Sequence, residues 1–408
     1  MKKTISVLFT ILCLLLLQTV VSADENAQSY LNAYYGISFS EEVSMDDYNT
    51  ALIMLGAEPL SGDDFNLAAA VVGAVQLAEM DELALTYTNE KAGQKAFKTL
   101  EKEGISVNDA YVPYIACALD LGLIDDNDFN GPVSAQTAAV LLYRAAELSG
   151  KGRRSLGRLS DDFILNHVRD ILDSTIIFDE PEMNLAGINI LVNEAATGYS
   201  LKYNGYDANF IEENTIRYGH DDPTHLLQLI ALLQREGFDG YVQIEPKVSV
   251  YEYMPEWGEP RPSTVTYSVR EMTEGRFFAF SAEYELAIEF DTAAQKEAFH
   301  DLIETYAKKY DDRVDADGNP MKGLLAQSWW QPFYYSMTEM ENQEFEALTD
   351  NVIFNADHTF SIRSTGLPEQ SAAIAEAAAD VNPDLQAEER TIYVNPAFYR
   401  YITGSDYQ

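Results

Sequence analysis

The chain has 408 residues, with 66 Asp and Glu against 27 Lys and Arg, and a formal net charge of −39 at pH 7. A charge this negative argues against nucleic acid as a partner, because phosphate backbones are bound through clustered Lys and Arg. It also disfavours adsorption to anionic lipid, and the length predicts two domains or more.

The first 23 residues have the three parts of a secretory signal peptide. Lys2 and Lys3 give a positive start, residues 5–17 are almost wholly apolar, and residues 21–23 (Val-Ser-Ala) place small side chains before a cut after Ala23. The apolar run is short for a bilayer span, which needs about 20 residues. We therefore expect cleavage, no transmembrane segment afterwards, and an extracellular, cell-surface or cell-wall location.

Residues 27–150 predict an all-α module. Short segments of helical apolar periodicity are separated by Gly, Asp and Asn, and Ser134 is the expected N-cap of the last helix. Residues 151–178 begin with a basic, glycine-rich island and predict a linker. The expected helices of the module span 45–55, 67–80, 92–103, 112–121 and 134–148.

Residues 179–408 predict an α+β domain. Asp222 followed by Pro223 is typical of a helix start, here of a leucine-rich helix that ends at Glu236. Residues 278–290 alternate apolar side chains with serine and glutamate, which predicts a strand with one buried face. Other strands are expected at 241–245, 248–254, 264–269 and 392–394, a hairpin around 355–357, and helices at 292–310 and 368–381.

Residues 111–148 resemble an S-layer homology (SLH) repeat of bacterial cell-surface proteins. Such repeats pair a helix like that of residues 111–124 with a loop, which here carries Phe129 and Pro132, and with a second helix containing a stretch like Ala-Val-Leu-Leu-Tyr-Arg. Residues 37–55 are similar to part of an earlier copy, and 151–178 to part of a further one. The resemblance implies binding to the secondary polysaccharide of a Gram-positive cell wall.

The SLH groove carries a Thr-Arg-Ala-Glu motif at the start of the second helix, and its arginine is absent here. Residues 134–137 read Ser-Ala-Gln-Thr and residues 44–47 read Ser-Met-Asp-Asp. An anionic glycan needs a fixed positive donor. Arg144, Arg153 and Arg154 are the candidate glycan-binding residues, and a solvated linker with a helix-end arginine is the alternative.

A second resemblance concerns residues 218–245. Their polar turn, leucine-rich helix, Gly-Phe-Asp and strand are similar to the core of transglutaminase-like folds, in which a cysteine starts the helix. Here His220 or His225 lies there instead, and Cys117, the only cysteine left after cleavage, is far away in sequence. This resemblance implies a catalytically dead relative.

Aromatic and acidic residues supply the remaining candidates. Trp329 and Trp330 begin the densest aromatic run, which could stack on glycan or peptide or could close a core; with His220 and His225 they are the candidate pocket residues. Paired carboxylates for glycoside hydrolysis could come from Glu245, Glu252 and Glu256, beside Tyr251, Tyr253 and Trp257.

No motif predicts a cofactor. The histidines lack zinc-site spacing, two partial calcium loops at 126–131 and 313–319 lack essential ligands, and neither a phosphate-binding glycine loop nor a nucleophile elbow is present. We therefore expect no cofactor and no metal. The function expected is that of an exported, non-enzymatic cell-surface protein that associates with cell-wall polysaccharide; the alternative is an extracellular hydrolase or the dead transglutaminase-like domain on the same module.

Overall fold

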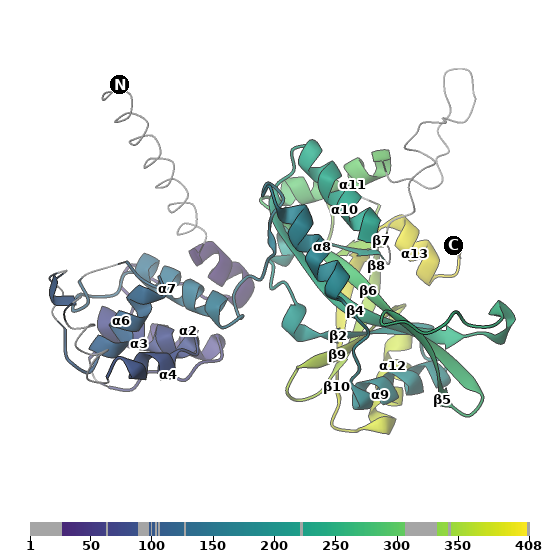
Figure 1. The fold of residues 1–408 in the computed structure, drawn as a ribbon, viewed down its shortest axis with the longest axis horizontal. Helices are drawn as coiled ribbons and strands as arrows, with labels where there is room; N and C mark the ends of the chain where they lie inside the picture. The colour runs from purple at the N-terminus through teal and green to yellow at the C-terminus, as the bar shows by residue number, and fades with distance from the viewer. Residues whose placement is uncertain are drawn as a thin grey trace, which may run out of the picture. The chain divides into compact units, whose positions relative to one another are not determined.

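The chain divides into two compact units, residues 1–153 and 154–408, shown in Figure 1. In the computed structural model each unit is built around its own buried side chains. The structure describes residues 27–62, 64–88, 98, 100–102, 104, 107–125, 128–220, 223–306, 333–341 and 344–405, with only the backbone of His220.

The described elements of the first unit are helices. The helix α3 (Leu67–Leu77) is buried along most of its length and packs against four others, as its Ala- and Val-rich sequence predicts. Ser134 caps α7 by accepting a hydrogen bond from the backbone N–H of Thr137 at 3.1 Å, which confirms the expected start. The helix expected over 92–103 lies largely outside the described residues. The others span 27–35, α2 (Met45–Met54), α4 (Asp81–Thr86), α6 (Val112–Asp120) and α7 (Ala135–Leu148).

The second unit is a closed antiparallel barrel. Strand β4 (Gly240–Tyr253) pairs with β6 (Arg276–Phe290) along its whole length, and this pairing joins the two ends of the ring β4-β2-β9-β8-β10-β7-β3-β6. Two strands extend the sheet outside the ring: β1 (Gly157–Arg158) beside β4 and β5 (Tyr267–Thr273) beside β6. The remaining strands are β2 (Gly198–Tyr203), β3 (Thr215–His220), β7 (Phe333–Ser336), β8 (Glu346–Phe354), β9 (Phe360–Gly366) and β10 (Gln386–Val394).

The fold class expected from the sequence, an all-α module followed by an α+β domain, was wrong, because the sheet of the second unit closes on itself. The strands expected at 241–245 and 248–254 are one strand, β4. Pro246 has no N–H to donate, and it lies between the stretches of β4 that pair with β1 and with β2. The expected hairpin around 355–357 is confirmed by the pairing of β8 with β9.

Helices cover the outer surface of the barrel in two groups (Figure 1). Apolar side chains of β3, β4 and β6 form one core with α8 (Ile164–Ser174), α10 (Pro223–Arg235) and α11 (Ala293–Tyr306). A second core joins α9 (Pro181–Val192) and α12 (Ser371–Val381) to strands that include β2 and β9. The segment expected as a linker therefore contributes β1 and α8 to this unit.

The barrel is apolar outside and polar inside. On β6, Leu286 and Ile288 face the helices, whereas Glu283, Glu285 and Glu289 alternate with them and point the other way. We expected these glutamates to face solvent, but Glu285 and Glu289 are buried. Closure of the sheet converts the solvent face of an open sheet into an interior surface.

Gly187 lets α9 approach β2 closely, and this contact gives a prediction. A Cβ at this position would lie 2.4 Å from the ring of Tyr199, which is buried. Helix propensity alone would make Gly187→Ala stabilising by about 0.5–1 kcal/mol, but overpacking costs about 1–3 kcal/mol. We therefore expect Gly187→Ala to lower the stability of the second unit. Urea unfolding followed by tryptophan fluorescence measures this, because all three tryptophans lie in residues 154–408. Equal or higher stability would show that the helix shifts freely.

Candidate functional site

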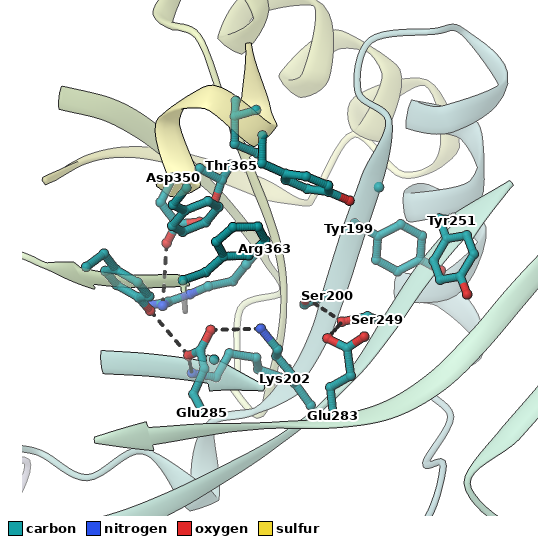
Figure 2. Close-up of a pocket in the computed structure, with 18 of the residues that line it drawn as sticks. Tyr199, Ser200, Lys202, Ser249, Tyr251, Glu283, Glu285, Asp350, Arg363 and Thr365 are labelled. Atoms are coloured by element: carbon teal, nitrogen blue, oxygen red, sulfur yellow. Dashed lines mark hydrogen bonds and ion pairs between the residues drawn. The ribbon is translucent and has the colours of Figure 1, made fainter. Parts of the chain in front are cut away.

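The barrel interior contains a cavity of about 450 Å³ (Figure 2). Its wall is built from inward-facing side chains of β2, β4, β6 and β7 to β9, and α13 (Pro396–Ile402) adds Phe398, Tyr401 and Ile402. The volume lies in the usual range of small-molecule sites, about 300–1,000 Å³. The described residues of the lining include aromatic rings, hydroxyl groups, three cations and three carboxylates.

Lys202 is the centre of a buried ion cluster in the cavity wall. Its side chain is 2% exposed, and its Nζ lies 2.7 Å from Glu245 Oε2 and 3.0 Å from Glu285 Oε2. The other oxygen of Glu285 accepts from Lys247 Nζ at 3.0 Å, and the Tyr335 hydroxyl donates to Glu285 Oε2 at 3.2 Å. The charges are thus paired and hydrogen-bonded, as burial requires.

Glu245 connects this cluster to the layer behind it. Its Oε1 accepts from the backbone N–H of Ala208 at 3.0 Å, and Arg217 Nε lies 3.8 Å from its Oε2. Arg217 in turn donates to both carboxylate oxygens of Glu212, at 2.5 and 2.9 Å. These contacts fix the position of Glu245 from two further directions.

The pKa values of the groups in the cluster are shifted away from neutral pH. Burial alone would lower the pKa of Lys202, but Glu245 and Glu285 outweigh it and the pKa is raised. Burial alone would raise the pKa of Glu285, but Lys202 and Lys247 hold it well below its usual range. Burial, with the charge of Glu285, raises the pKa of Tyr335. At pH 7 both lysines are therefore charged, and the glutamate is ionised.

A second polar group lies on neighbouring strands of the same wall. Ser249 Oγ donates to Glu283 Oε2 at 2.6 Å and lies 3.3 Å from Ser200 Oγ, its cross-strand neighbour. Among the described residues, no cation lies within 4 Å of the Glu283 carboxylate. Figure 2 shows this group beside Tyr251. Hydroxyls and a carboxylate next to an aromatic ring can hydrogen-bond and stack on a polar ligand.

Arg363 on β9 also faces the cavity (Figure 2). Its Nη1 lies 3.4 Å from Asp350 Oδ2 on the adjacent strand, and its Nε is buried with no hydrogen-bond partner. In the part of the chain that the structure describes, this ion pair is the only polar contact of the guanidinium group.

The three arginines predicted to bind glycan are not brought together as one site. Arg144 Nη1 lies 3.2 Å from Asp125 and donates to the backbone oxygen of Gly122. Arg153 is 7% exposed, donates to the Tyr143 hydroxyl at 3.0 Å and lies over the ring of Tyr30. In the second unit, Arg154 donates to the backbone oxygen of Gly205.

His225 is the one predicted pocket residue whose side chain the structure describes, and it is not among the described residues that line the cavity. His220 ends β3, where its backbone pairs with Tyr284 of β6, and His225 is half-buried in the first turns of α10. Trp329 and Trp330 lie outside the described residues. Cys117 is buried in α6, and burial raises the pKa of its thiol to about 11.

The carboxylates considered for glycoside hydrolysis also have separate surroundings. Glu245 belongs to the buried cluster, Glu252 forms a bidentate pair with Arg276 at 2.8 and 2.6 Å, and Glu256 is exposed. Tyr251 alone of their three aromatic neighbours lines the cavity.

Sequence analysis missed Lys202, Lys247, Glu285, Asp350 and Arg363. Their signal is a charged residue at an alternate position of an otherwise apolar strand, as in the Ser-Leu-Lys of β2 and the Ser-Ile-Arg of β9. In a chain with 66 acidic residues such positions are ordinarily solvent-exposed.

Comparisons with protein families, curated proteins and solved structures found no match to this chain. Among the described residues, none of the helices has the length and apolar character needed to cross a membrane.

Proposed function

We propose that the protein is an exported, non-enzymatic binding protein whose barrel holds one small polar molecule. The observation that carries this proposal is the cavity of about 450 Å³, into which aromatic, hydroxyl and charged side chains point from several strands. The helices on the outer surface hold the wall in place, so the cavity is preformed. Small-molecule sites typically combine such an enclosed volume with a few fixed polar groups.

Binding fits the cavity better than catalysis. General acid–base chemistry needs a group whose pKa lies near the working pH. In the cavity wall the pKa values of Lys202, Lys247 and Tyr335 are raised and that of Glu285 is well below its usual range, so these groups do not exchange protons near neutrality. Ser249 has a carboxylate as its neighbour, and neither histidine nor cysteine is among the described lining residues.

The sequence supports an extracellular place for this binding. The signal-peptide pattern of residues 1–23 supports export, and the SLH resemblance of residues 111–148 supports the cell wall as the location and its polysaccharide as a partner of the first unit. The net charge of −39 argues against nucleic acid.

The test is a screen for ligands followed by a variant that fills the cavity. A panel of neutral sugars, sugar acids, amino acids and organic acids is screened by thermal shift, and ligand at about 100 times Kd stabilises the fold by about 2.7 kcal/mol. Gly219 lines the cavity, and a Cβ there would meet only the Phe333 backbone oxygen, at 4.0 Å. We expect Gly219→Leu to abolish the shift while the protein keeps its stability.

The graded control is Gly219→Ala, which adds one methyl group and should reduce binding only slightly. If no panel member binds, or if Gly219→Leu binds every hit as well as the unmodified protein does, the cavity is not a binding site and the proposal fails.

A further inference from the structure

The arginines of the second unit differ in how fully they are used. Arg217, Arg276 and Arg390 each donate to both oxygens of a carboxylate, at 2.5–3.0 Å. Arg363 has the same five N–H donors, yet in the described part of the chain it has one ion pair at 3.4 Å and no hydrogen bond. Its side chain is 16% exposed and borders the cavity, so that its terminal Nη groups, though not the buried Nε, can be reached from there.

An N–H donor that is left without a hydrogen bond in the interior destabilises the protein. The guanidinium fork matches two oxygen atoms of one planar anion. A ligand carboxylate in the cavity would accept from the terminal Nη groups of Arg363, while Asp350 stays beside Nη1. The guanidinium N–H groups of Arg363 that make no hydrogen bond among the described residues therefore indicate an anionic group on the ligand.

The charge balance of the wall limits that group to a single negative charge. The ammonium groups of Lys202 and Lys247 already bond to Glu245 and Glu285. Arg363 is the remaining cation of the described lining, and Glu283 and Asp350 add carboxylates of their own. A phosphate dianion would face uncompensated repulsion in this setting, whereas a carboxylate carries one charge.

The other polar groups of the wall suit hydroxyls. Among the described residues, only Oε2 of Glu283 accepts a hydrogen bond, from Ser249, and Ser200 lies on the next strand. Ionised carboxylates only accept hydrogen bonds, and serine hydroxyls donate and accept. Tyr251 and Tyr401 provide ring surfaces in the same cavity. This combination matches a ring that carries several hydroxyl groups.

We propose that the ligand is a hydroxylated monocarboxylic acid of sugar size, such as a hexuronic acid, whose carboxylate binds Arg363 and whose hydroxyls bind the Glu283–Ser249 group. The proposal rests on the proposed function of the cavity. It assigns Arg363 the recognition of the acid and separates this ligand class from neutral sugars, sugar phosphates and amino acids.

Calorimetric titration of the purified protein tests the proposal with matched probes. Glucuronic and galacturonic acid are compared with glucose and galactose, which lack only the carboxylate. We expect the acids to bind about 10- to 100-fold more tightly, as one charged hydrogen-bonded contact provides. Arg363→Gln should lower the affinity for the acids to about that for the neutral sugars, and Arg363→Lys should retain part of the difference.

The comparison of probes on the unmodified protein needs no variant, so it decides the question even if Arg363→Gln fails to fold. Equal affinity for acid and neutral sugar, or tighter binding of glucose 1-phosphate or of an amino acid, would overturn this ligand class. If those ligands are still blocked by Gly219→Leu, the proposed function stands and only the inference fails. If no probe of any class binds, the proposed function itself fails.

Discussion

Replacing Lys202 by methionine is expected to lower the free energy of unfolding of the second unit by about 3–5 kcal/mol. The substitution keeps most of the side-chain volume but leaves Glu245, 1% exposed, and Glu285 without the ammonium group that they share. Removing one partner of a buried ion pair typically costs this much, because the remaining charge stays desolvated. Urea unfolding followed by tryptophan fluorescence reports on this unit alone.

Two control variants separate the charge effect from the loss of packing. Lys247→Met removes a single bond to Glu285 from a more exposed side chain, so the loss should be smaller. Combining Lys202→Met with Glu245→Gln removes the carboxylate that loses its ammonium partner, leaves Glu285 paired with Lys247, and should recover most of the lost stability. An unchanged urea midpoint in Lys202→Met would contradict the ion cluster as described.

The local elements of the fold could be predicted from sequence because their signals are local. The Ser134 cap, the Pro223 start of α10 and the hairpin between β8 and β9 depend on a few neighbouring residues, and the structure has all three. Closure of the barrel depends on the pairing of β4 with β6, strands whose residues lie up to 50 positions apart, as Gly240 and Phe290 do. No local pattern specifies such a partner.

The site was missed for a related reason. A period of two along β6 shows that Glu283 and Glu285 share a face, but it does not show whether that face meets water or the interior of a closed barrel. For Arg153 the sequence pattern was also a poor guide, because a basic residue among glycines suggests a solvated linker. Its guanidinium group instead lies over the Tyr30 ring, a contact that a flat cation favours.

The ion cluster also explains how a chain with so few cations can hold a polar cavity. Four of its 27 Lys and Arg residues lie in or directly behind the cavity wall: Lys202, Lys247, Arg217 and Arg363. All four lie beside carboxylates of the wall or of the layer behind it, and Lys202, Lys247 and Arg217 form hydrogen bonds with theirs. Among the described residues Arg363 has only the 3.4 Å ion pair with Asp350 and no hydrogen bond, and that difference separates the structural cations from the one that we assign to the ligand.

Acid is expected to destabilise the second unit through Glu285. Despite burial, Lys202 and Lys247 hold the pKa of Glu285 well below its ordinary value of 4.5, whereas the unfolded chain takes up its proton near that ordinary value. Below about pH 4.5 the unfolded state therefore binds more protons than the folded state. The stabilisation by Glu285 is complete above that pH and is lost as the pH falls through the folded-state pKa.

The experiment compares the urea midpoints of the unmodified protein and of Glu285→Gln between pH 7 and pH 3, by tryptophan fluorescence. The variant should be less stable at pH 7 and should lose less stability below pH 4.5, so that the two curves converge. The comparison cancels the relief of repulsion that protonation brings to a chain of net charge −39. Glu252→Gln is the matched control, because the pair of Glu252 with Arg276 is partly exposed and contributes about 1 kcal/mol or less. Parallel curves for Glu285→Gln and the unmodified protein would show that Glu285 does not control the acid response.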